Sequence, residues 1–268
     1  MPQDKDQQEA DKVEEQTTPR TPVIYETVRR LGEQEMARPA VSLWWSGLAA
    51  GLSMSFSLLA QAVLRHHLPQ ASWRELIVAL GYPVGFLMVV LSRQQLFTET
   101  TITVLLPLLQ QPDRHKLAGA GRIWAIVLVA NLAGTLLAAL FFAFTPAVDD
   151  GLRQAMLESS RHALQHNALA LGVQGITAGY LMAAMVWLIP AAGVAQFHIV
   201  SLMTYLIGVG GFAHIIAGSV EAFLLVLTGE LGALDMLTRF TLPVLLGNVV
   251  GGTVLFALLS HAQVMKEV

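Results

Sequence analysis

The chain divides into long apolar runs separated by short polar segments, and the lengths of these runs predict where it crosses a membrane. A stretch free of Asp, Glu, Lys and Arg is a candidate span when it can cross about 30 Å of hydrocarbon as a helix. The longest such stretch, 162–220, is divided by Pro190-Ala-Ala-Gly193. Four full spans are predicted in this way, near residues 40–64, 123–148, 167–189 and 240–265.

Two further apolar segments, 76–111 and 195–228, are interrupted. Ser92-Arg93-Gln94-Gln95 interrupts the first, and Gly208-Val209-Gly210-Gly211 interrupts the second. Such sequences are costly at membrane depth unless the backbone lines a cavity or is buried in protein. The order full, broken, full occurs twice, and three crossings per half give the halves opposite orientations, as in inverted-repeat transport folds. We therefore predict an all-α membrane protein with six transmembrane helices, two of them broken, in a 3+3 inverted repeat. The transmembrane domain is predicted at 40–265, with repeats at about 40–148 and 165–265.

Short motifs recur in the two halves. The third span carries Asn131-Leu-Ala-Gly134, and the sixth carries Asn248-Val-Val-Gly251. Thr98 and His214 stand at nearly equal distances before these asparagines, which pairs Thr98 with His214 across the repeat. The first and fourth spans each carry Gly-xxx-Gly, a pattern that also serves plain helix packing.

Composition supports a membrane protein and excludes several other classes. The chain is 54% hydrophobic and only 13% charged, with a mean hydropathy of +0.57, whereas soluble domains carry about 25% charged residues. There are no cysteines, so disulfides, iron–sulfur clusters and thiol catalysis are excluded. No basic patch with interleaved aromatics suggests a nucleic-acid partner. His162 and His166 are spaced for a metal, but a third ligand is missing nearby, and we predict neither a metal nor a cofactor.

The charges outside the apolar runs predict the orientation. Six Lys/Arg and nine Asp/Glu fall within residues 1–40, which we interpret as a polar cytoplasmic tail at 1–39. Residues 23–36 are predicted to form a short amphipathic helix near the inner surface. With the N-terminus inside, seven basic residues flank the inner ends of the spans and five lie in the outer loops, which favours cytoplasmic N- and C-termini.

Several motifs of the chain resemble those of a known family, the formate–nitrite transporters. The motifs that carry the resemblance are Leu96-Phe97-Thr98, Gly211-Phe212-Ala213-His214, Trp124 with Asn131 and Gly134, and Pro243-Val-Leu-Leu-Gly247-Asn248-Val-Val-Gly251-Gly252. The resemblance covers about residues 40–260. It implies an aquaporin-like protomer, a homopentamer in a bacterial inner membrane, and one pore per protomer that passes small monovalent anions such as formate or nitrite.

The sequence departs from the family pattern around both breaks. Members usually carry glycine and an acidic residue where this chain has Arg93 and Gln95. They usually carry Glu just before the histidine and Asn four residues after it, where this chain has Ala213 and Gly218. These departures leave the permeant species open.

His214 and Thr98 are the leading candidate pore residues. His214 is expected at the start of the second half-helix, where unpaired N–H groups and the helix dipole favour an anion. Its imidazole could relay a proton to a weak-acid anion, or it could simply satisfy a hydrogen bond between helices. Thr98 is expected to open the first half-helix, as an N-cap, a pore ligand or both.

Other residues are candidates for the walls and mouths of the pore. Apolar side chains above and below the centre would penalise a bare ion and favour a neutral acid, although packing is their alternative role. The apolar candidates are Leu96, Phe97, Phe86 and Ile207. Arg93 and Glu99 flank the first break and are expected to form an ion pair; the alternative is that Arg93 faces the pore and holds an anion. Glu221 lies two helical turns after His214 and is expected at an outer vestibule or a subunit contact.

The residues thus favour a channel or secondary transporter for small anions or their weak acids. Two alternatives stay open: a pore for neutral small solutes, and a non-conducting membrane scaffold of the same fold. An enzyme is not predicted, because the chain lacks Gly-xxxx-Gly-Lys, His-Glu-xx-His and Gly-x-Ser-x-Gly.

Overall fold

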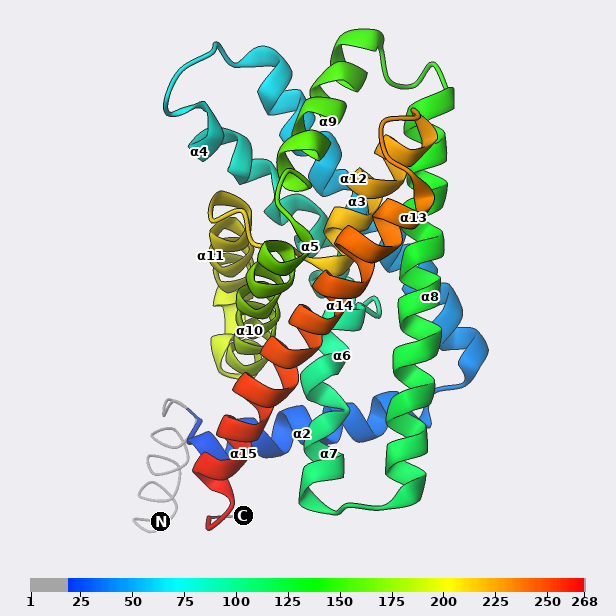
Figure 1. The fold of residues 1–268 in the computed structure, drawn as a ribbon. Coiled ribbons are helices and arrows are strands. Elements are labelled where there is room, and N and C mark those ends of the chain that lie inside the picture. The colour runs from blue at the N-terminus through cyan, green and yellow to red at the C-terminus, as the bar shows by residue number, and fades with distance from the viewer. Residues whose placement is uncertain (1–18, 268) are drawn as a thin grey trace.

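The computed structural model describes residues 19–267, which form a bundle of helices without a strand in that range (Figure 1). The first part of the predicted tail, 1–18, and residue 268 lie outside the described residues. The first half contains α2 (Thr21–Ala37), α3 (Ala40–His67), α4 (Arg74–Val78), η1 (Ala79–Gly81), α5 (Pro83–Leu91), α6 (Phe97–Thr103), α7 (Leu105–Gln110) and α8 (Arg114–Phe144). The second half contains α9 (Asp150–Ala163), α10 (Ala168–Ala192), η2 (Gly193–Ala195), α11 (Gln196–Val209), α12 (Ile215–Leu227), α13 (Ala233–Asp235), α14 (Leu242–Val249) and α15 (Leu258–Val264), with π-helical turns η3 (Met236–Thr241) and η4 (Val250–Ala257).

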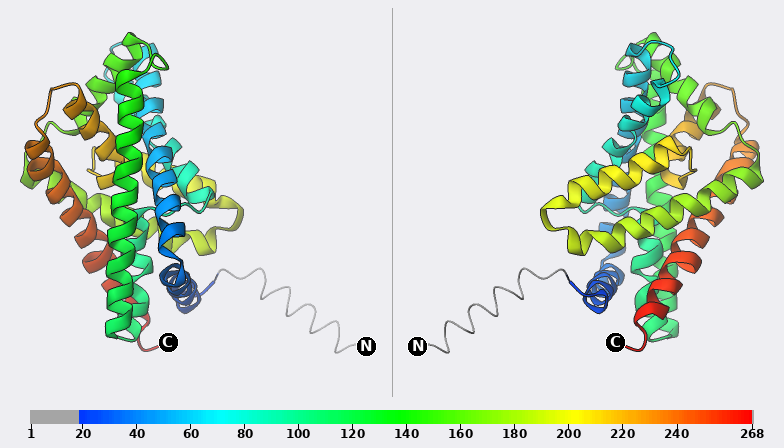
Figure 2. Two further views of the ribbon diagram at one scale, coloured as in Figure 1. Left: turned by 90° about the vertical axis from the view of Figure 1, so that its right-hand side faces the viewer. Right: turned by 90° about the vertical axis from the view of Figure 1, so that its left-hand side faces the viewer.

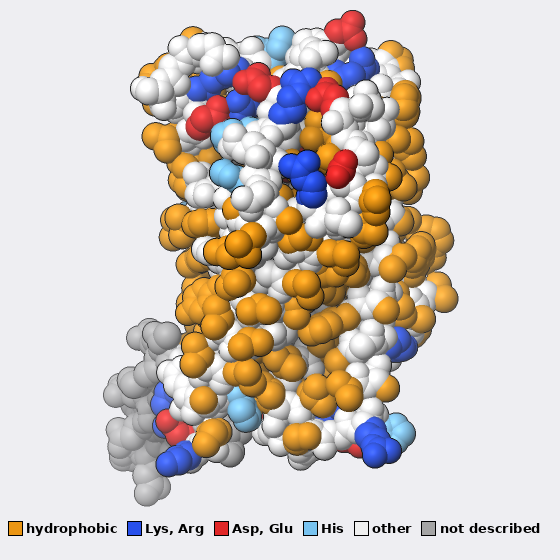
Figure 3. Space-filling view, in the orientation of Figure 1, with side chains coloured by type: hydrophobic (Ala, Val, Ile, Leu, Met, Phe, Trp, Pro, Cys, Tyr) orange, Lys and Arg blue, Asp and Glu red, His pale blue; other side chains and the backbone are white. Residues whose placement is uncertain are grey.

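The surface of the bundle has the character of a membrane protein. Five helical stretches are long and apolar enough to cross a bilayer, and α12 is a shorter apolar helix. Large apolar side chains such as Trp45 and Leu246 are exposed on their flanks. Figure 3 shows hydrophobic side chains over the middle of one face and charged side chains gathered towards its two ends. The five stretches are Ala40–His67, Arg74–Leu91, Arg114–Phe144, Ala168–Val209 and Ala233–Val264.

Both predicted breaks are present. Helix α5 ends at Leu91 and α6 begins at Phe97, while α11 ends at Val209 and α12 begins at Ile215. Each connection contains one residue with a positive φ, Arg93 at 56° and Gly211 at 63°. A left-handed residue cannot continue a right-handed helix, so the chain turns and restarts at these points.

Glycines let the long helices approach closely beside the two asparagines of the predicted repeat. A Cβ atom on Gly51 of α3 would lie 2.2 Å from the carbonyl oxygen of Asn131 in α8. A Cβ atom on Gly179 of α10 would lie 2.2 Å from the carbonyl oxygen of Asn248 in α14. The small residues of the two Gly-xxx-Gly motifs therefore serve close helix packing.

Two amphipathic helices cover opposite ends of the bundle. Helix α2, at the place predicted for a helix at 23–36, lies across the end that holds α7 and α15 (Figures 1 and 2). Tyr25 buries its ring there and bonds His261 of α15, with 2.8 Å between Tyr25 Oη and His261 Nδ1. Helix α9 covers the other end, and its N-cap Asp149 accepts a hydrogen bond from the Leu152 N–H. The sequence predicted only a connecting loop for this stretch, because its few apolar residues do not indicate a membrane span.

Candidate functional site

A buried asparagine fixes the start of the first half-helix. The side-chain carbonyl of Asn131, on α8, accepts a hydrogen bond from the Phe97 N–H over 2.9 Å. Its amide group donates to the carbonyl oxygens of Gly47, over 2.8 Å, and Gln95, over 2.9 Å. One side chain therefore joins α3, α8 and the loop before α6, and it satisfies three buried backbone groups.

Asn248 does the same for the second half-helix. Its side-chain carbonyl accepts from the Ile215 N–H over 2.8 Å. Its amide donates to the carbonyl oxygens of Gly175, over 2.8 Å, and Ala213, over 3.0 Å. The two asparagines thus hold equivalent atoms in the two halves of the chain.

These hydrogen bonds correct the predicted pairing of residues between the two halves of the chain. Because Phe97 and Ile215 occupy the same position, the residue equivalent to His214 is Leu96, and both are the N-caps of their helices. Thr98 lies two residues after Leu96, inside α6, so the prediction that it caps the helix is wrong. The predicted pairing is two residues out of register, because Phe97 lies 34 residues before Asn131 whereas its equivalent, Ile215, lies 33 residues before Asn248.

Thr98 and His214 nevertheless meet at the centre of the bundle. Thr98 Oγ1 lies 2.8 Å from His214 Nε2, and both side chains are buried. The other ring nitrogen, Nδ1, accepts a hydrogen bond from the Ala217 N–H over 3.2 Å and so caps α12. Since Nδ1 is an acceptor, the neutral ring carries its proton on Nε2 and donates it to Thr98. The Thr98 hydroxyl proton is then available for a third group.

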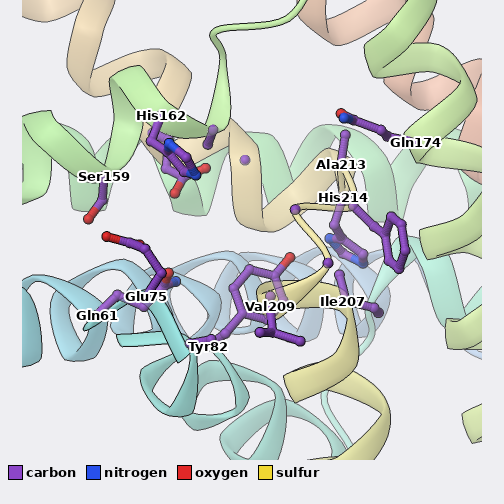
Figure 4. A pocket seen from close by; sticks show the side chains of 18 of the residues that line it. Gln61, Glu75, Tyr82, Ser159, His162, Gln174, Ile207, Val209, Ala213 and His214 are labelled. Atoms are coloured by element: carbon purple, nitrogen blue, oxygen red, sulfur yellow. The ribbon is translucent and has the colours of Figure 1, made fainter. Parts of the chain in front are cut away.

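Apolar side chains surround this pair. The Phe86 ring meets the His214 ring edge to face, with 5.1 Å between centroids. Leu96 and Ile207 are also buried, and Ile207 lies beside His214 in Figure 4. Phe97 instead packs against Trp124 of α8, with 6.0 Å between ring centroids. The structure therefore places Phe86 and Ile207 next to the polar pair, whereas the Phe97 ring turns to the neighbouring helix.

A cavity of about 260 Å³ leads from the α9 end of the bundle to His214. Its floor is the loop before α12, and its walls come from α3, α4, α9, α10 and α12 (Figure 4). Gln61, Tyr82 and Gln174 supply polar groups, and the side-chain oxygen of Gln174 has no hydrogen-bond partner within the described residues. A small polar solute entering from this end would reach the Thr98–His214 pair through a polar-lined cavity.

Two buried arginines brace the mouth of this cavity, and sequence reasoning did not single them out. The Arg65 guanidinium donates to both carboxylate oxygens of Glu75, over 2.8 and 2.6 Å, and to Ser159 Oγ over 2.9 Å. Arg74 donates to the Arg65 carbonyl and, over 3.4 Å, to Glu158. These bonds attach α9 to α3 and α4. The sequence feature that could have pointed to them is that Arg65 and Arg74 lie on either side of the polar turn after the first span.

Glu221 lies on the wall of the same cavity, in accordance with one of its two predicted places. His162 and His166 also line the cavity. Within residues 19–267, no group of three or more His, Asp or Glu side chains is arranged to hold a metal ion.

The predicted ion pair between Arg93 and Glu99 is not formed. Arg93 is exposed, and no carboxylate of the described chain lies within salt-bridge distance of it. Glu99 Oε1 is buried without a hydrogen-bond partner in the same range. Arg93 takes a left-handed backbone, φ 56°, where the chain turns between α5 and α6, and its side chain is exposed instead of crossing the loop.

Arg93→Gly is therefore expected to stabilise the protein, since glycine adopts a positive φ without the steric cost that arginine incurs. We expect a gain of about 1 kcal/mol, a rise of roughly 2–4 °C in thermal midpoint. The matched control is Gly211→Ala, which places a Cβ at φ 63° where no atom lies within 4 Å, and should lose a similar amount. A midpoint for Arg93→Gly at or below that of the wild type would show that the arginine makes a stabilising contact.

Glu35 links α2 to the first half-helix and was also missed. One of its carboxylate oxygens accepts from Gln95 Nε2 over 3.2 Å, and the other accepts from the Thr103 hydroxyl. Gly32, one turn earlier, packs directly on the Thr103 carbonyl. Burial raises the pKa of Glu35, and the hydrogen bonds from Thr103 and Gln95 oppose this rise only in part.

This raised pKa predicts that α2 binds less firmly as pH rises. The folded state binds the Glu35 proton more tightly than the unfolded state. The resulting stabilisation is therefore fully present below the ordinary pKa of a glutamate and is lost as the pH rises through the raised pKa. Glu35→Gln should therefore reduce the fall in thermal midpoint between pH 5 and pH 8. Glu33→Gln, at an exposed site on the same helix, is the control and should leave that fall unchanged. Equal falls in Glu35→Gln and the wild type would contradict the prediction.

The helices, the two breaks and the buried polar pair together define a helical membrane protein with a central polar site. The sequence pattern of the formate/nitrite transporter family matches residues 22–262. The chain belongs to this family, whose members are channels and transporters and not enzymes.

Individual relatives and structures agree with this assignment. The inner membrane protein YfdC of Escherichia coli is 40% identical over 254 residues, covering 95% of this chain and 82% of the relative. The formate channel BtFdhC of Bacillus thuringiensis is 25% identical, covering 85% of this chain and 89% of the relative. A pentameric formate channel with formate bound superimposes with a TM-score of 0.70 at 20% identity, covering 84% of this chain and 98% of that one.

Proposed function

We propose that the chain is a channel or secondary transporter for small monovalent anions or their weak acids, of the formate or nitrite class. The observation that carries the proposal is the buried Thr98–His214 hydrogen bond at the end of a polar-lined cavity. The family and a relative named as a formate channel support the same class of solute.

The chemistry of the centre suits a small anion better than a cation. The first turn of α12 presents N–H groups and the positive end of its dipole. Asn248 and His214 occupy two of these N–H groups, at Ile215 and Ala217. Neutral His214 donates a hydrogen bond from Nε2 to the hydroxyl oxygen of Thr98. The hydroxyl proton of Thr98 can then be donated to an oxygen atom of a bound solute. The surrounding apolar side chains of Phe86 and Ile207 disfavour a bare ion.

A more specific form of this proposal is that His214 relays a proton to the solute. The hydrogen bonds of the imidazole ring make this step unfavourable. With a proton already on Nε2, a second proton must bind Nδ1. That would break the hydrogen bond from the Ala217 N–H and leave the α12 cap unmade. We therefore assign His214 first to hydrogen-bond donation in its neutral form.

We further propose six crossings in an inverted 3+3 repeat, a homopentamer in a bacterial inner membrane, and cytoplasmic N- and C-termini. The matching hydrogen bonds of Asn131 and Asn248 support the repeat. The pentameric formate channel of the same fold supports the assembly. In this orientation α2 faces the cytoplasm, and the cavity beneath α9 is an outer vestibule.

The test is flux into proteoliposomes that contain the purified protein. Formate and nitrite uptake above that of protein-free liposomes is the expected result. Glycerol uptake without anion uptake would replace this proposal by a pore for neutral solutes. Absence of all three fluxes from a folded, reconstituted protein would identify a non-conducting scaffold.

A further inference from the structure

Glu221 is a buried carboxyl that no protein group satisfies. It lies on α12 two turns beyond His214, lines the outer vestibule, and is only 8% exposed. No hydrogen bond or ion pair joins its carboxyl to any group within residues 19–267. Leaving a carboxylate in this position without a partner is costly.

Arg65, a basic side chain of the same cavity, already has other hydrogen-bond partners. Arg65 lines the same vestibule, but its three nitrogens donate to Glu75, Glu158 and Ser159. Of the other elements against α12, α6 contributes Glu99 and η3 contributes Arg239, which lines a separate pocket beside Phe240. The titratable or charged side chains that line the vestibule with Glu221 are Arg65, Glu75, Tyr82, His162, His166 and His214.

The surroundings suggest what Glu221 binds. An uncharged carboxyl is a hydrogen-bond donor, and an anion is its strongest acceptor. The vestibule connects Glu221 with the outer solution on one side and with His214 on the other, so the carboxyl stands between the solvent and the apolar centre. An anion that stops beside Glu221 must next pass Phe86 and Ile207, where a neutral species is favoured over an ion.

We propose that Glu221 is the proton donor of the outer vestibule, and that it protonates a small carboxylate or nitrite anion before the solute reaches His214. In this step the O–H bond of Glu221 breaks and an O–H bond forms on the anion, which becomes its neutral acid. The electron pair stays on the Glu221 carboxylate, which then takes a proton from water in the vestibule. The inference rests on the proposed function, because it requires that an anion enters the vestibule.

The experiment compares wild type with Glu221→Gln in proteoliposomes that have equal pH inside and outside, at pH 5.5 and 9.5. Formate uptake and the pH of the lumen are measured together, and the flux of protein-free liposomes is subtracted. Once a donor carboxyl ionises, each pH unit lowers its protonated fraction about tenfold, so wild-type flux should fall steeply with pH. Glu221→Gln should lose at least about tenfold in flux at pH 5.5 and should lose the dependence on pH.

Two further variants make the result specific. Glu221→Asp keeps a titratable carboxyl and should keep the pH dependence at reduced flux, even if the glutamine variant folds poorly. Glu230→Gln removes a partly exposed carboxylate that pairs with Arg161 outside the vestibule, and should behave as wild type. If Glu221→Gln retains the pH profile and the acidification of the lumen per formate, the inference is wrong while the proposed function stands. If wild type conducts no formate or nitrite, the proposed function itself fails.

Discussion

His214→Asn is expected to lower anion flux by about two- to tenfold while leaving the helices intact. Asparagine is a good N-cap, so its side-chain oxygen can accept the Ala217 N–H that now bonds His214 Nδ1. It cannot reproduce the hydrogen bond from Nε2 to Thr98, which orients the hydroxyl. A hydrogen bond between neutral groups contributes about 0.5–1.5 kcal/mol, which corresponds to this range of flux.

The pH profile of the same variant separates two roles for the imidazole. If His214 relays the proton, its removal should abolish the dependence of formate flux on pH. If Glu221 supplies the proton and His214 only donates a hydrogen bond, the residual flux should keep the wild-type profile. Thr98→Val, which removes the hydroxyl and keeps the shape, is the matched variant and should lower flux to a similar extent. Wild-type flux in both variants would show that the pair is not in the path.

Asn248→Ala is expected to cause the largest loss of stability of any single substitution considered. The side chain is fully buried and satisfies the Ile215 N–H and the carbonyl oxygens of Gly175 and Ala213. Its removal leaves three buried backbone groups without partners, at about 1–3 kcal/mol each. A total loss of about 3 kcal/mol or more corresponds to a drop of roughly 6–12 °C in thermal midpoint.

Two controls calibrate this loss. Asn131→Ala breaks the equivalent set of hydrogen bonds in the other half and should cost a similar amount. Asn167→Ala removes an exposed asparagine that caps α10 and should cost only about 1 kcal/mol. Thermal midpoints of the three variants in one detergent decide the matter. A midpoint for Asn248→Ala equal to that of Asn167→Ala would mean that water replaces the lost bonds.

The sequence predicted the breaks well because their causes are local. A polar run before Phe97 and a glycine cluster before His214 both end helices whatever the rest of the chain does. The amphipathic period of α2 was readable for the same reason. The stretch that forms α9 was not, because a short polar helix at a membrane surface carries no hydropathy signal.

The site residues were only partly predictable, because their roles depend on contacts between distant parts of the chain. Thr98 was correctly expected to face His214, but the expectation rested on a pairing of positions between the two halves that the structure does not have. Arg93 was paired with Glu99 on proximity in sequence, whereas in the structure Arg93 is exposed at a left-handed turn and a carboxylate oxygen of Glu99 is buried. Glu35 was passed over because it belongs to a polar tail, and only its burial beneath α6 shows that it matters.

By itself, the sequence determined the class of protein, the places of the long helices and the positions of both interruptions. These follow from hydropathy, helix length and turn residues, which act over a few neighbouring residues. Only the tertiary structure decided that Asn131 and Asn248 hold the two half-helices, that Thr98 meets His214, and that Glu221 stands unpartnered in the vestibule. The physical reason is that hydrogen bonds and burial between residues far apart in sequence are set by how the helices pack, which no local pattern encodes.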